Sequence, residues 1–194
     1  MKAAAEMPPI LEPEDEIQEF WLRIARRYLL PTLSMMSGNA LFLVEIWQVL
    51  KLYDVSLRWG LYEEWRNVTY KSHPELNAQR IVIEREAKGI LRRLSIKSES
   101  LSGTVAKMVH TNPIIFFTIA LNQVQSYSNL SDVVLSSLKY CTIMGLDILV
   151  FLLLEALASP HKERVKEDGT NISDWLQSML PLNVWFYENS YLCK

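Results

Sequence analysis

The sequence is poor in residues that cross-link or interrupt a chain. Of its 194 residues, two are cysteine, six are glycine and eight are proline. Two cysteines, Cys141 and Cys193, cannot build the disulfide framework of a small secreted domain, so a reduced intracellular setting fits best. Leucine, glutamate, alanine and isoleucine recur in long stretches with little glycine or proline between them, which favours an all-helical chain.

The sequence also lacks an excess of charge and a long uncharged apolar run. Its net charge is -2 and its pI about 6.0, whereas a nucleic-acid-binding domain usually has a pI above about 9, so any RNA contact must come from a local patch. The most apolar segment, residues 141–158, contains Asp147 and Glu155, which argues against a membrane span and predicts a buried helix. Residues 1–16 hold no apolar core of signal-peptide length, so we expect no secretory leader.

Patterns that carry chemistry are scarce. His73, His110 and His161 lie far apart and form no metal-binding spacing, and neither a glycine-rich phosphate loop nor a nucleophile elbow is present. Residues 136–139 match Ser-x-x-Lys, but the companion motifs are absent, and we interpret the match as a helix surface. Cys141 is interpreted as a packing residue on an apolar face. We therefore expect no metal, no cofactor and no enzymatic activity.

Helix signals begin after a short N-terminal segment. Residues 1–12 are expected to be flexible, and the acidic residues after Pro13 predict the start of a helix. Pro31 predicts that this helix ends near Leu30. The Ser-Gly-Asn sequence at residues 37–39 predicts a turn before the next helix.

Two further helices are expected in the first half of the chain. Residues 40–53 predict a largely buried helix, and Asp54 is placed to cap the helix that follows. In that following helix, apolar residues recur at helical spacing and predict one buried stripe. The residues of this stripe are Leu57, Leu61, Trp65 and Val68.

The next helix begins near Pro74 and has two contrasting faces. Its apolar face carries Ile83, Ala87, Ile90 and Leu94. Its opposite face carries Arg85, Lys88 and Arg92. This basic face is either a solvated surface or a contact for an acidic partner or an RNA backbone, and the sequence leaves both readings open.

Two helix junctions are expected in the second half. A helix over residues 101–110 precedes Asn112, whose side chain is placed to accept from the free amides of the next helix, and Pro113 fits the first turn of that helix. Residues 128–160 then predict one long helix or two, with Gly145 as the expected kink.

Residues 148–158 are apolar nearly all round when projected on a helix, so this helix must be covered on both sides. Asp147 and Glu155 break the pattern. Because a buried carboxylate is costly unless it is paired, we expect both to lie near the helix edge or to face a basic partner.

The charged stretch 161–179 poses the sharpest choice between a binding loop and a corner. It lacks the ligand spacing of a calcium loop. Gly169, after Asp168, supplies a turn, Asn171 is placed as an N-cap, and Asp174 follows it as the acid of a capping box. We interpret the charges before this turn as the exposed end of the preceding helix and the stretch as a helix-to-helix corner.

No strand alternation persists anywhere in the sequence. Successive antiparallel helices of about 12 to 20 residues, joined by short turns, predict an α-solenoid or a slab of helical repeats. The expected fold class is therefore all-α.

Several segments, in one order, resemble the central region of the THO complex subunit 2 family. The similarity is collinear from about Trp21 to Ser178. The similar segments are residues 29–67, 73–95, 107–130 and 136–178. The most specific motifs are Asn112-Pro113 and residues 137–140, 155–158, 168–171 and 175–178.

The resemblance implies a non-catalytic role. The family is the large helical scaffold of the nuclear THO complex, part of the THO/TREX machinery that packages nascent messenger RNA during transcription and couples it to export. Its central region is similar to the middle domain of translation-initiation scaffolds, a fold that commonly docks DEAD-box RNA helicases. Residues 13–178 correspond to this scaffold region, an internal slice of a very large protein, whereas residues 179–194 depart from the family pattern as a divergent tail.

The resemblance and the charge pattern together predict a nuclear scaffold module that binds other THO complex subunits, a DEAD-box RNA helicase and messenger ribonucleoprotein. The alternative is a helical module that binds single-stranded RNA directly through the same cations. The candidate contact residues, chosen by charge and position, are Arg85, Lys88, Arg92, Lys162, Arg164 and Lys166.

Overall fold

The computed structural model describes residues 13–36, 38–93, 99–138, 141–167 and 169–188. These ranges are all-α and contain no strand, with one isolated antiparallel bridge between Val165 and Ile172. The elements, in chain order, are α1 (Pro13–Ile24), the π-helical turn η1 (Ala25–Leu29), α2 (Leu30–Met35), α3 (Ala40–Leu50), α4 (Val55–Glu64), the π-helical turn η2 (Trp65–Thr69), α5 (Tyr70–Ser72), α6 (Pro74–Arg93), α7 (Glu99–Thr111), α8 (Pro113–Ser126), the 3₁₀ turn η3 (Ser128–Leu130), α9 (Ser131–Ser137), α10 (Ile143–Ala158) and α11 (Asp174–Glu188).

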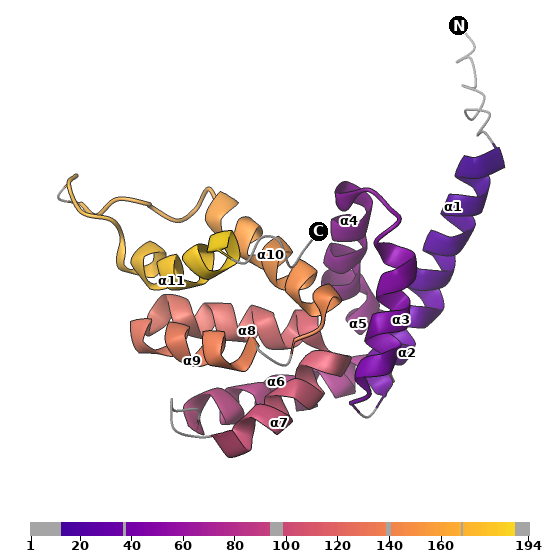
Figure 1. Cartoon of the computed structure of the whole chain (residues 1–194), viewed down its shortest axis with the longest axis horizontal. Coiled ribbons are helices and arrows are strands. Elements are labelled where there is room, and N and C mark those ends of the chain that lie inside the picture. Colours follow the sequence, from indigo (N-terminus) through magenta and orange to yellow (C-terminus); the bar gives the residue numbers. More distant parts are fainter. Residues whose placement is uncertain (1–12, 37, 94–98, 139–140, 168, 189–194) are drawn as a thin grey trace, which may run out of the picture.

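Helix α8 forms the centre of the molecule. Figure 1 shows α6 and α7 on one side of it and α10 and α11 on the other, with α1, α2 and α3 at one end, and α8 contacts α6, α7, α10 and α11. Its buried side chains include Phe116 and Phe117, so most of its surface is removed from water. Among the described helices, none is both long enough and apolar enough to cross a bilayer.

The first rod, formed by α1, η1 and α2, continues past the expected end. The prediction that Pro31 stops the helix near Leu30 is wrong, since α2 runs to Met35. The reason lies in η1, where the Leu30 amide donates to the Ala25 carbonyl, five residues back. This wider turn restarts the helix with Pro31 in its first turn, where a missing amide costs little.

Helix α3 starts as expected but is not largely buried. Gly38 has a φ of 60° and Asn39 accepts from the Leu41 amide at 2.9 Å, which confirms the described part of the predicted turn. The prediction of a largely buried helix is wrong, because α3 packs on α7 and α10 along one face and leaves Leu41 and Phe42 exposed on another. A helix at the edge of a stack has neighbours on one side, so its composition alone overstates its burial.

The predicted stripe of α4 is half right. Asp54 caps this helix, accepting from the Ser56 amide at 2.8 Å, and Leu61 and Trp65 are buried, whereas Leu57 and Val68 are exposed. Leu57 lies in the first turn. The π-helical turn η2 adds a residue to the last turn, which rotates Val68 away from the core.

The junction between α7 and α8 confirms one prediction and corrects another. Pro113 occupies the first turn of α8 as expected. Asn112, however, makes no cap hydrogen bond with its side chain, so its prediction as a helix cap is wrong. The side chain is fully buried and bonds to α2 and α5 instead, because the helix start lies against those elements rather than in water.

The chain breaks before Gly145, not at it. Two helices form, α9 and α10, and the Thr142 hydroxyl accepts from the Gly145 amide at 3.3 Å, which places Gly145 in the first turn of α10. The prediction of a kink at Gly145 is therefore wrong. Gly145 leaves room for a neighbour, since a Cβ there would lie 2.6 Å from the Cys141 Sγ and the Cys141 side chain would have to move.

The charged corner between α10 and α11 is a small hairpin. The predicted corner is confirmed, but its charges are not the end of a helix, since α10 ends at Ala158. The Lys166 amide donates to the Asn171 carbonyl at 2.8 Å, and Gly169 turns the chain with a φ of 69°. Because Asn171 pairs in this hairpin and α11 starts at Asp174, the prediction of Asn171 as its N-cap is wrong.

Helix α11 runs beyond the expected boundary after Ser178. It continues to Glu188 with Pro181 inside it, and Met179 and Leu182 are buried against the rest of the molecule. The first part of the segment expected to be a divergent tail is therefore packed helix. Residues 1–12, expected to be flexible, lie outside the described residues.

Candidate functional site

The two acidic residues of α10 face arginines, as predicted. The Asp147 carboxylate accepts from Arg58 through two bonds of 3.3 Å and from the Tyr62 hydroxyl at 2.9 Å. The Glu155 carboxylate accepts from both terminal nitrogens of Arg66 at 2.6 and 2.5 Å. These contacts join α4 and η2 to α10 along what we call the α4–α10 seam, defined by these five residues.

Aromatic rings support the arginines of the α4–α10 seam. The Arg58 guanidinium lies 5.2 Å from the ring centroid of Trp47, and that of Arg66 lies 5.8 Å from Phe151. Burial, and then the Asp147 charge, hold the pKa of Tyr62 well above its ordinary value, and the hydrogen bond to Glu155 raises the pKa of Arg66. Tyr62 therefore stays neutral and Arg66 stays charged. With these contacts the α4–α10 seam fixes the two helices to each other.

A second polar cluster is fully enclosed. The Tyr70 hydroxyl donates to Asn112 Oδ1 at 2.7 Å, the Asn112 amide donates to the Ser34 carbonyl at 3.2 Å, and the Trp65 indole donates to the Ser34 hydroxyl at 2.9 Å. Burial raises the pKa of the Tyr70 hydroxyl. Each of these side chains is at most 1% exposed, so we assign the cluster to holding α2, α5 and the start of α8 together.

The predicted contact residues of the charged corner are used within the molecule. We call Lys162, Arg164 and Lys166 the loop cations. The Lys162 ammonium donates to the Gln125 side chain and lies 5.3 Å from the Trp175 ring centroid. Arg164 donates to the Leu157 carbonyl at 3.1 Å, and Lys166 lies 2.6 Å from an Asp174 carboxylate oxygen.

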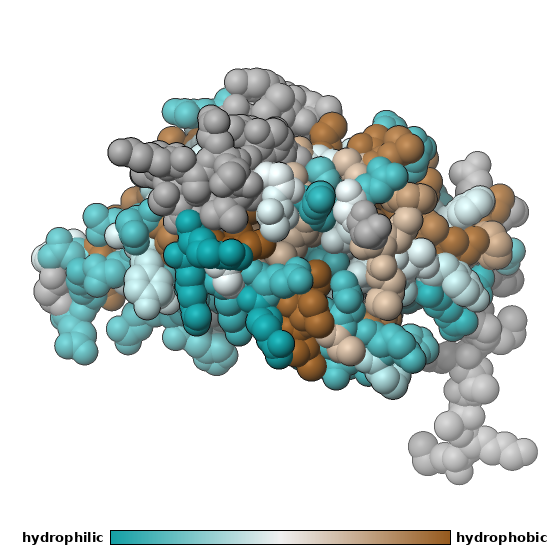
Figure 2. All heavy atoms as spheres, turned by 90° about the horizontal axis from the view of Figure 1, so that it is seen from below, coloured by the Kyte–Doolittle hydropathy of each residue, from teal (hydrophilic) through white to brown (hydrophobic). Residues whose placement is uncertain are grey.

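The predicted contact residues of α6 show no such partners among the described residues. We call Arg85, Lys88 and Arg92 the α6 basic row. All three are exposed, and within the described part of the chain none makes an ion pair. In Figure 2, which views the α6 and α7 side, hydrophilic side chains gather beside hydrophobic ones, and α6 exposes Ile81 and Val82. Since α8 lies between α6 and the corner (Figure 1), the six predicted residues do not form one site.

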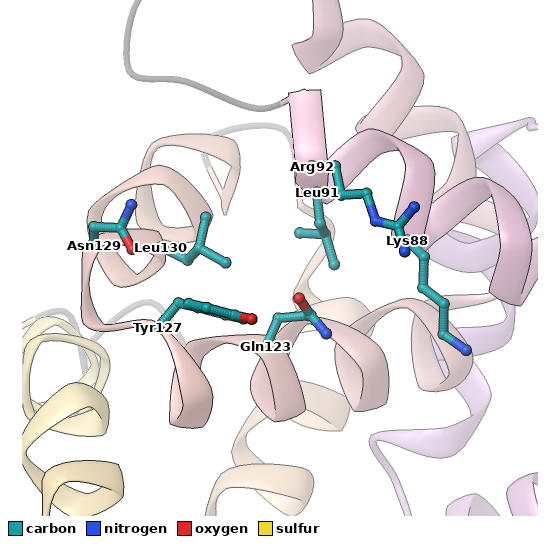
Figure 3. A pocket seen from close by; sticks show the side chains of 7 residues that line it. All are labelled: Lys88, Leu91, Arg92, Gln123, Tyr127, Asn129 and Leu130. Carbon is teal, nitrogen blue, oxygen red and sulfur yellow. The ribbon is translucent and has the colours of Figure 1, made fainter.

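Two members of the α6 basic row border a cavity of about 590 Å³, which we call the α6 pocket. Figure 3 shows Lys88, Leu91 and Arg92 on α6, opposite side chains from the end of α8 and from η3. The lining residues are Lys88, Leu91, Arg92, Gln123, Tyr127, Asn129 and Leu130. No carboxylate is among them, so the charge of this lining is positive.

The reactive side chains considered from the sequence do not converge in the described residues. No group of three or more His, Cys, Asp or Glu side chains is placed to hold a metal ion there. Burial raises the pKa of the Cys141 thiol to about 12, so it stays protonated at neutral pH. Lys139 of the Ser-x-x-Lys match lies outside the described residues.

Sequence reasoning missed two sets of residues that the structure brings together. The neutral side of the α6 pocket, Gln123, Tyr127 and Asn129, was not considered, although polar residues ending an apolar helix are a signal of exposure. The partners of the acidic residues were also not named. Arg58 and Arg66 are eight positions apart, as are Asp147 and Glu155, and this matched spacing on two helices was the available signal.

Two family models match the chain, one in each half. The family model described as THO complex subunit 2 N-terminus matches residues 10–102. The model described as Transcription- and export-related complex subunit matches residues 105–180. The first match ends and the second begins within α7, and together they run from residue 10, before α1, to residue 180 in α11.

Individual relatives agree with the family models. THO complex subunit 2 of Homo sapiens is 41% identical over 169 residues, which are 87% of this chain and 11% of that protein. THO complex subunit 2 of Arabidopsis thaliana is 35% identical over 86% of this chain and 9% of that protein. That of Saccharomyces cerevisiae is 29% identical over 82% of this chain and 10% of that protein. The chain thus spans about a tenth of the length of these relatives.

Proposed function

The chain belongs to the THO complex subunit 2 family, and from this premise we propose that it is a non-catalytic scaffold segment of a nuclear THO complex. In this role it binds other THO complex subunits and helps to assemble messenger ribonucleoprotein during transcription. Through contacts that include a DEAD-box RNA helicase, it couples that particle to messenger RNA export. We further propose that its helices form one section of an α-solenoid of antiparallel repeats.

The observation that carries this proposal is the 41% identity with human THO complex subunit 2 over 87% of the chain. The internal arrangement supports a scaffold role. The α4–α10 seam and the buried cluster around Asn112 fix the helices rigidly, and α1, α3 and α6 keep exposed faces that partners can cover.

The test is an affinity purification of the tagged 194-residue chain from nuclear extract, followed by mass spectrometry. The expected result is recovery of THO complex subunits and of a DEAD-box RNA helicase above a tag-only control, after nuclease treatment. Recovery of neither, from a chain that unfolds cooperatively and is therefore folded, would contradict the proposal.

The α6 basic row supports a second candidate function, direct binding of single-stranded RNA. Three exposed cations that make no ion pair in the described part of the chain are available to neutralise phosphates. The affinity for an oligouridylate would then fall steeply between about 50 and 200 mM salt. Absence of binding at low salt removes this candidate.

We propose that the helicase contact involves the α6 basic row and the loop cations, the six residues predicted from charge and position. Changing the α6 basic row to glutamate is expected to weaken helicase recovery more than changing the loop cations, because the loop cations already contact the molecule's own groups. Unchanged helicase recovery from both sets of variants would exclude these residues as the contact.

A further inference from the structure

The α6 pocket is concave and lined by both polar and apolar side chains. Leu91 is buried and Leu130 is half-buried, and the two come from opposite walls, α6 and η3. Figure 3 shows both leucine side chains turned toward the space between these walls, with the Tyr127 ring and the Gln123 amide below them. A volume of about 590 Å³ lies within the range of sites that enclose a ligand group.

The polar side chains of this pocket have no partners among the residues that the structure describes. Within the described residues, the side chains of Gln123, Tyr127 and Asn129 make no hydrogen bond and those of Lys88 and Arg92 make no ion pair. By contrast, Arg66, which borders another cavity, is paired with Glu155. The α6 pocket therefore presents positive charge and hydrogen-bond donors that the fold itself does not use.

We infer that the α6 pocket docks an acidic linear segment of a partner protein. One hydrophobic side chain of that segment inserts between Leu91 and Leu130, and its neighbouring carboxylates contact Lys88 and Arg92. Arg85 and the exposed Ile81, one and two turns along the same face of α6, extend the contact beyond the pocket. The inference rests on the proposed scaffold function for the presence of protein partners and adds to it a site and a partner chemistry.

A peptide fits these features better than an RNA strand does. Binding of single-stranded RNA without sequence preference uses a positive groove that follows the backbone and several aromatic rings for stacking. Here the free cations form one row on a single helix, the exposed ring at the pocket is Tyr127 alone among its described lining, and the net charge of the chain is -2. Recognition of an acidic motif by a small cluster of cations beside an apolar hole needs no more than this.

The experiment measures the binding of a fluorescent synthetic peptide to the 194-residue chain by anisotropy. The peptide has about twelve residues, with glutamates flanking a central leucine and phenylalanine, matching an acidic motif with an apolar anchor. Saturable binding is expected for the wild-type chain. The double variant Lys88→Glu, Arg92→Glu is expected to weaken it by at least about tenfold, since both attractive contacts become repulsive.

A matched control separates the pocket from net charge. Lys51 and Lys71 are exposed and lie outside the pocket lining. Their double change to glutamate alters the net charge equally, and it is expected to leave peptide binding within about twofold, because distant exposed charges are screened by salt. Equal weakening by both double variants would overturn the inference.

A second variant tests the cavity rather than the charge. Gln123→Trp fills the α6 pocket without changing a charge. It is expected to lower the affinity for the peptide with the central leucine and phenylalanine by about tenfold. A peptide with glycines in place of the two central apolar residues is expected to bind more weakly to the wild-type chain and to be unaffected by this variant. Circular dichroism and thermal unfolding establish that each variant is folded.

The remaining outcomes also decide the matter. Absence of peptide binding to the folded wild-type chain overturns the inference, and so does tighter, pocket-dependent binding of an oligouridylate, which would assign the site to RNA. Failure of the chain to recover THO complex subunits while the pocket-dependent peptide binding persists counts against the proposed function and not against the pocket.

Discussion

The cations of α4 and η2 and those of α6 are chemically alike, yet their surroundings differ. Arg58 and Arg66 lie 12% and 17% exposed on the α4–α10 seam, each against a carboxylate. The α6 basic row is exposed and lacks such partners within the described residues. The difference lies in what stands opposite the cations. Opposite Arg58 and Arg66, α10 presents Asp147 and Glu155 at a matching spacing. Opposite the α6 basic row there are only solvent and the neutral side chains of the α6 pocket, among the described residues.

This comparison teaches that a basic residue type predicts neither stability nor binding until its neighbours are known. The loop cations make the same point. They were predicted as partner contacts on the same grounds as the α6 basic row, but Lys162 and Lys166 reach side chains of their own molecule. Variants at seam, loop and α6 positions should therefore separate into a graded series of effects on stability.

The largest effect is expected from Asp147→Ala. This change leaves the Arg58 guanidinium and the Tyr62 hydroxyl without their acceptor in a site where the paired side chains are 12% and 16% exposed. The free energy of unfolding is expected to fall by about 3 kcal/mol, measured by urea denaturation.

The double variant Arg58→Met, Asp147→Leu is the matched control for the α4–α10 seam. It removes both charges rather than one and should recover most of the lost stability. If it is as unstable as Asp147→Ala alone, the cost comes not from the unpaired Arg58 charge but from what both variants share, the lost acceptor of the Tyr62 hydroxyl and the altered packing. The contrast between paired and free cations is then not electrostatic.

A somewhat smaller loss is expected from Asn112→Ala, which tests the buried cluster. Asn112 is fully buried, and its removal leaves the Tyr70 hydroxyl without its acceptor and the Ser34 carbonyl without the Asn112 amide donor. Unfolding in urea should require about 2 kcal/mol less free energy. Asn122→Ala, at an exposed position on α8, should change stability by less than about 0.5 kcal/mol, and equal losses at the two sites would refute this role of Asn112.

Lys162→Ala is expected to have an intermediate effect. The ammonium contacts Gln125 and the face of Trp175, and loss of a partly exposed cation–π contact costs about 0.5 to 1 kcal/mol. The shift in thermal midpoint, compared with that of Lys71→Ala at an exposed site, measures it. If the two variants shift the thermal midpoint equally, Lys162 contributes no more to stability than an exposed lysine, which would contradict a structural role of this loop cation.

The smallest effect on stability is expected from the triple variant Arg85→Ala, Lys88→Ala, Arg92→Ala. Because these exposed side chains make no ion pair among the described residues, the free energy of unfolding should stay within about 0.5 kcal/mol of wild type. Binding of the acidic peptide should nevertheless be lost. A stability loss above about 1.5 kcal/mol would show that the row has a structural role.

Local signals in the sequence located the helices well. Asp54 and Pro113 occupy the helix starts predicted for them, because a capping oxygen or a missing amide acts within one turn of its own residue. The family and the all-α class were also predictable, the first from collinear motifs and the second from composition. That Asp147 and Glu155 would pair with basic residues was also predictable, though not which ones, because burying a lone carboxylate on an apolar helix is costly.

Signals that depend on distant neighbours failed. Asn112 has the sequence context of a cap, but α2 and α5 supply stronger buried partners from more than forty positions away. Val68 has the spacing of a core residue, but the π-helical turn η2 shifts its phase. Both outcomes depend on how other helices pack, and no local rule contains that information.

By itself the sequence determined that this chain folds as packed helices, where most of them start, and to which family it belongs, because helix propensity, capping and motif order are properties of neighbouring residues. Only the tertiary structure decided which cations pair with groups of the same molecule and which remain unpaired at the surface of the described residues. That choice depends on whether another helix places an acceptor within about 3 Å of each cation, and such a distance exists only after the helices have packed.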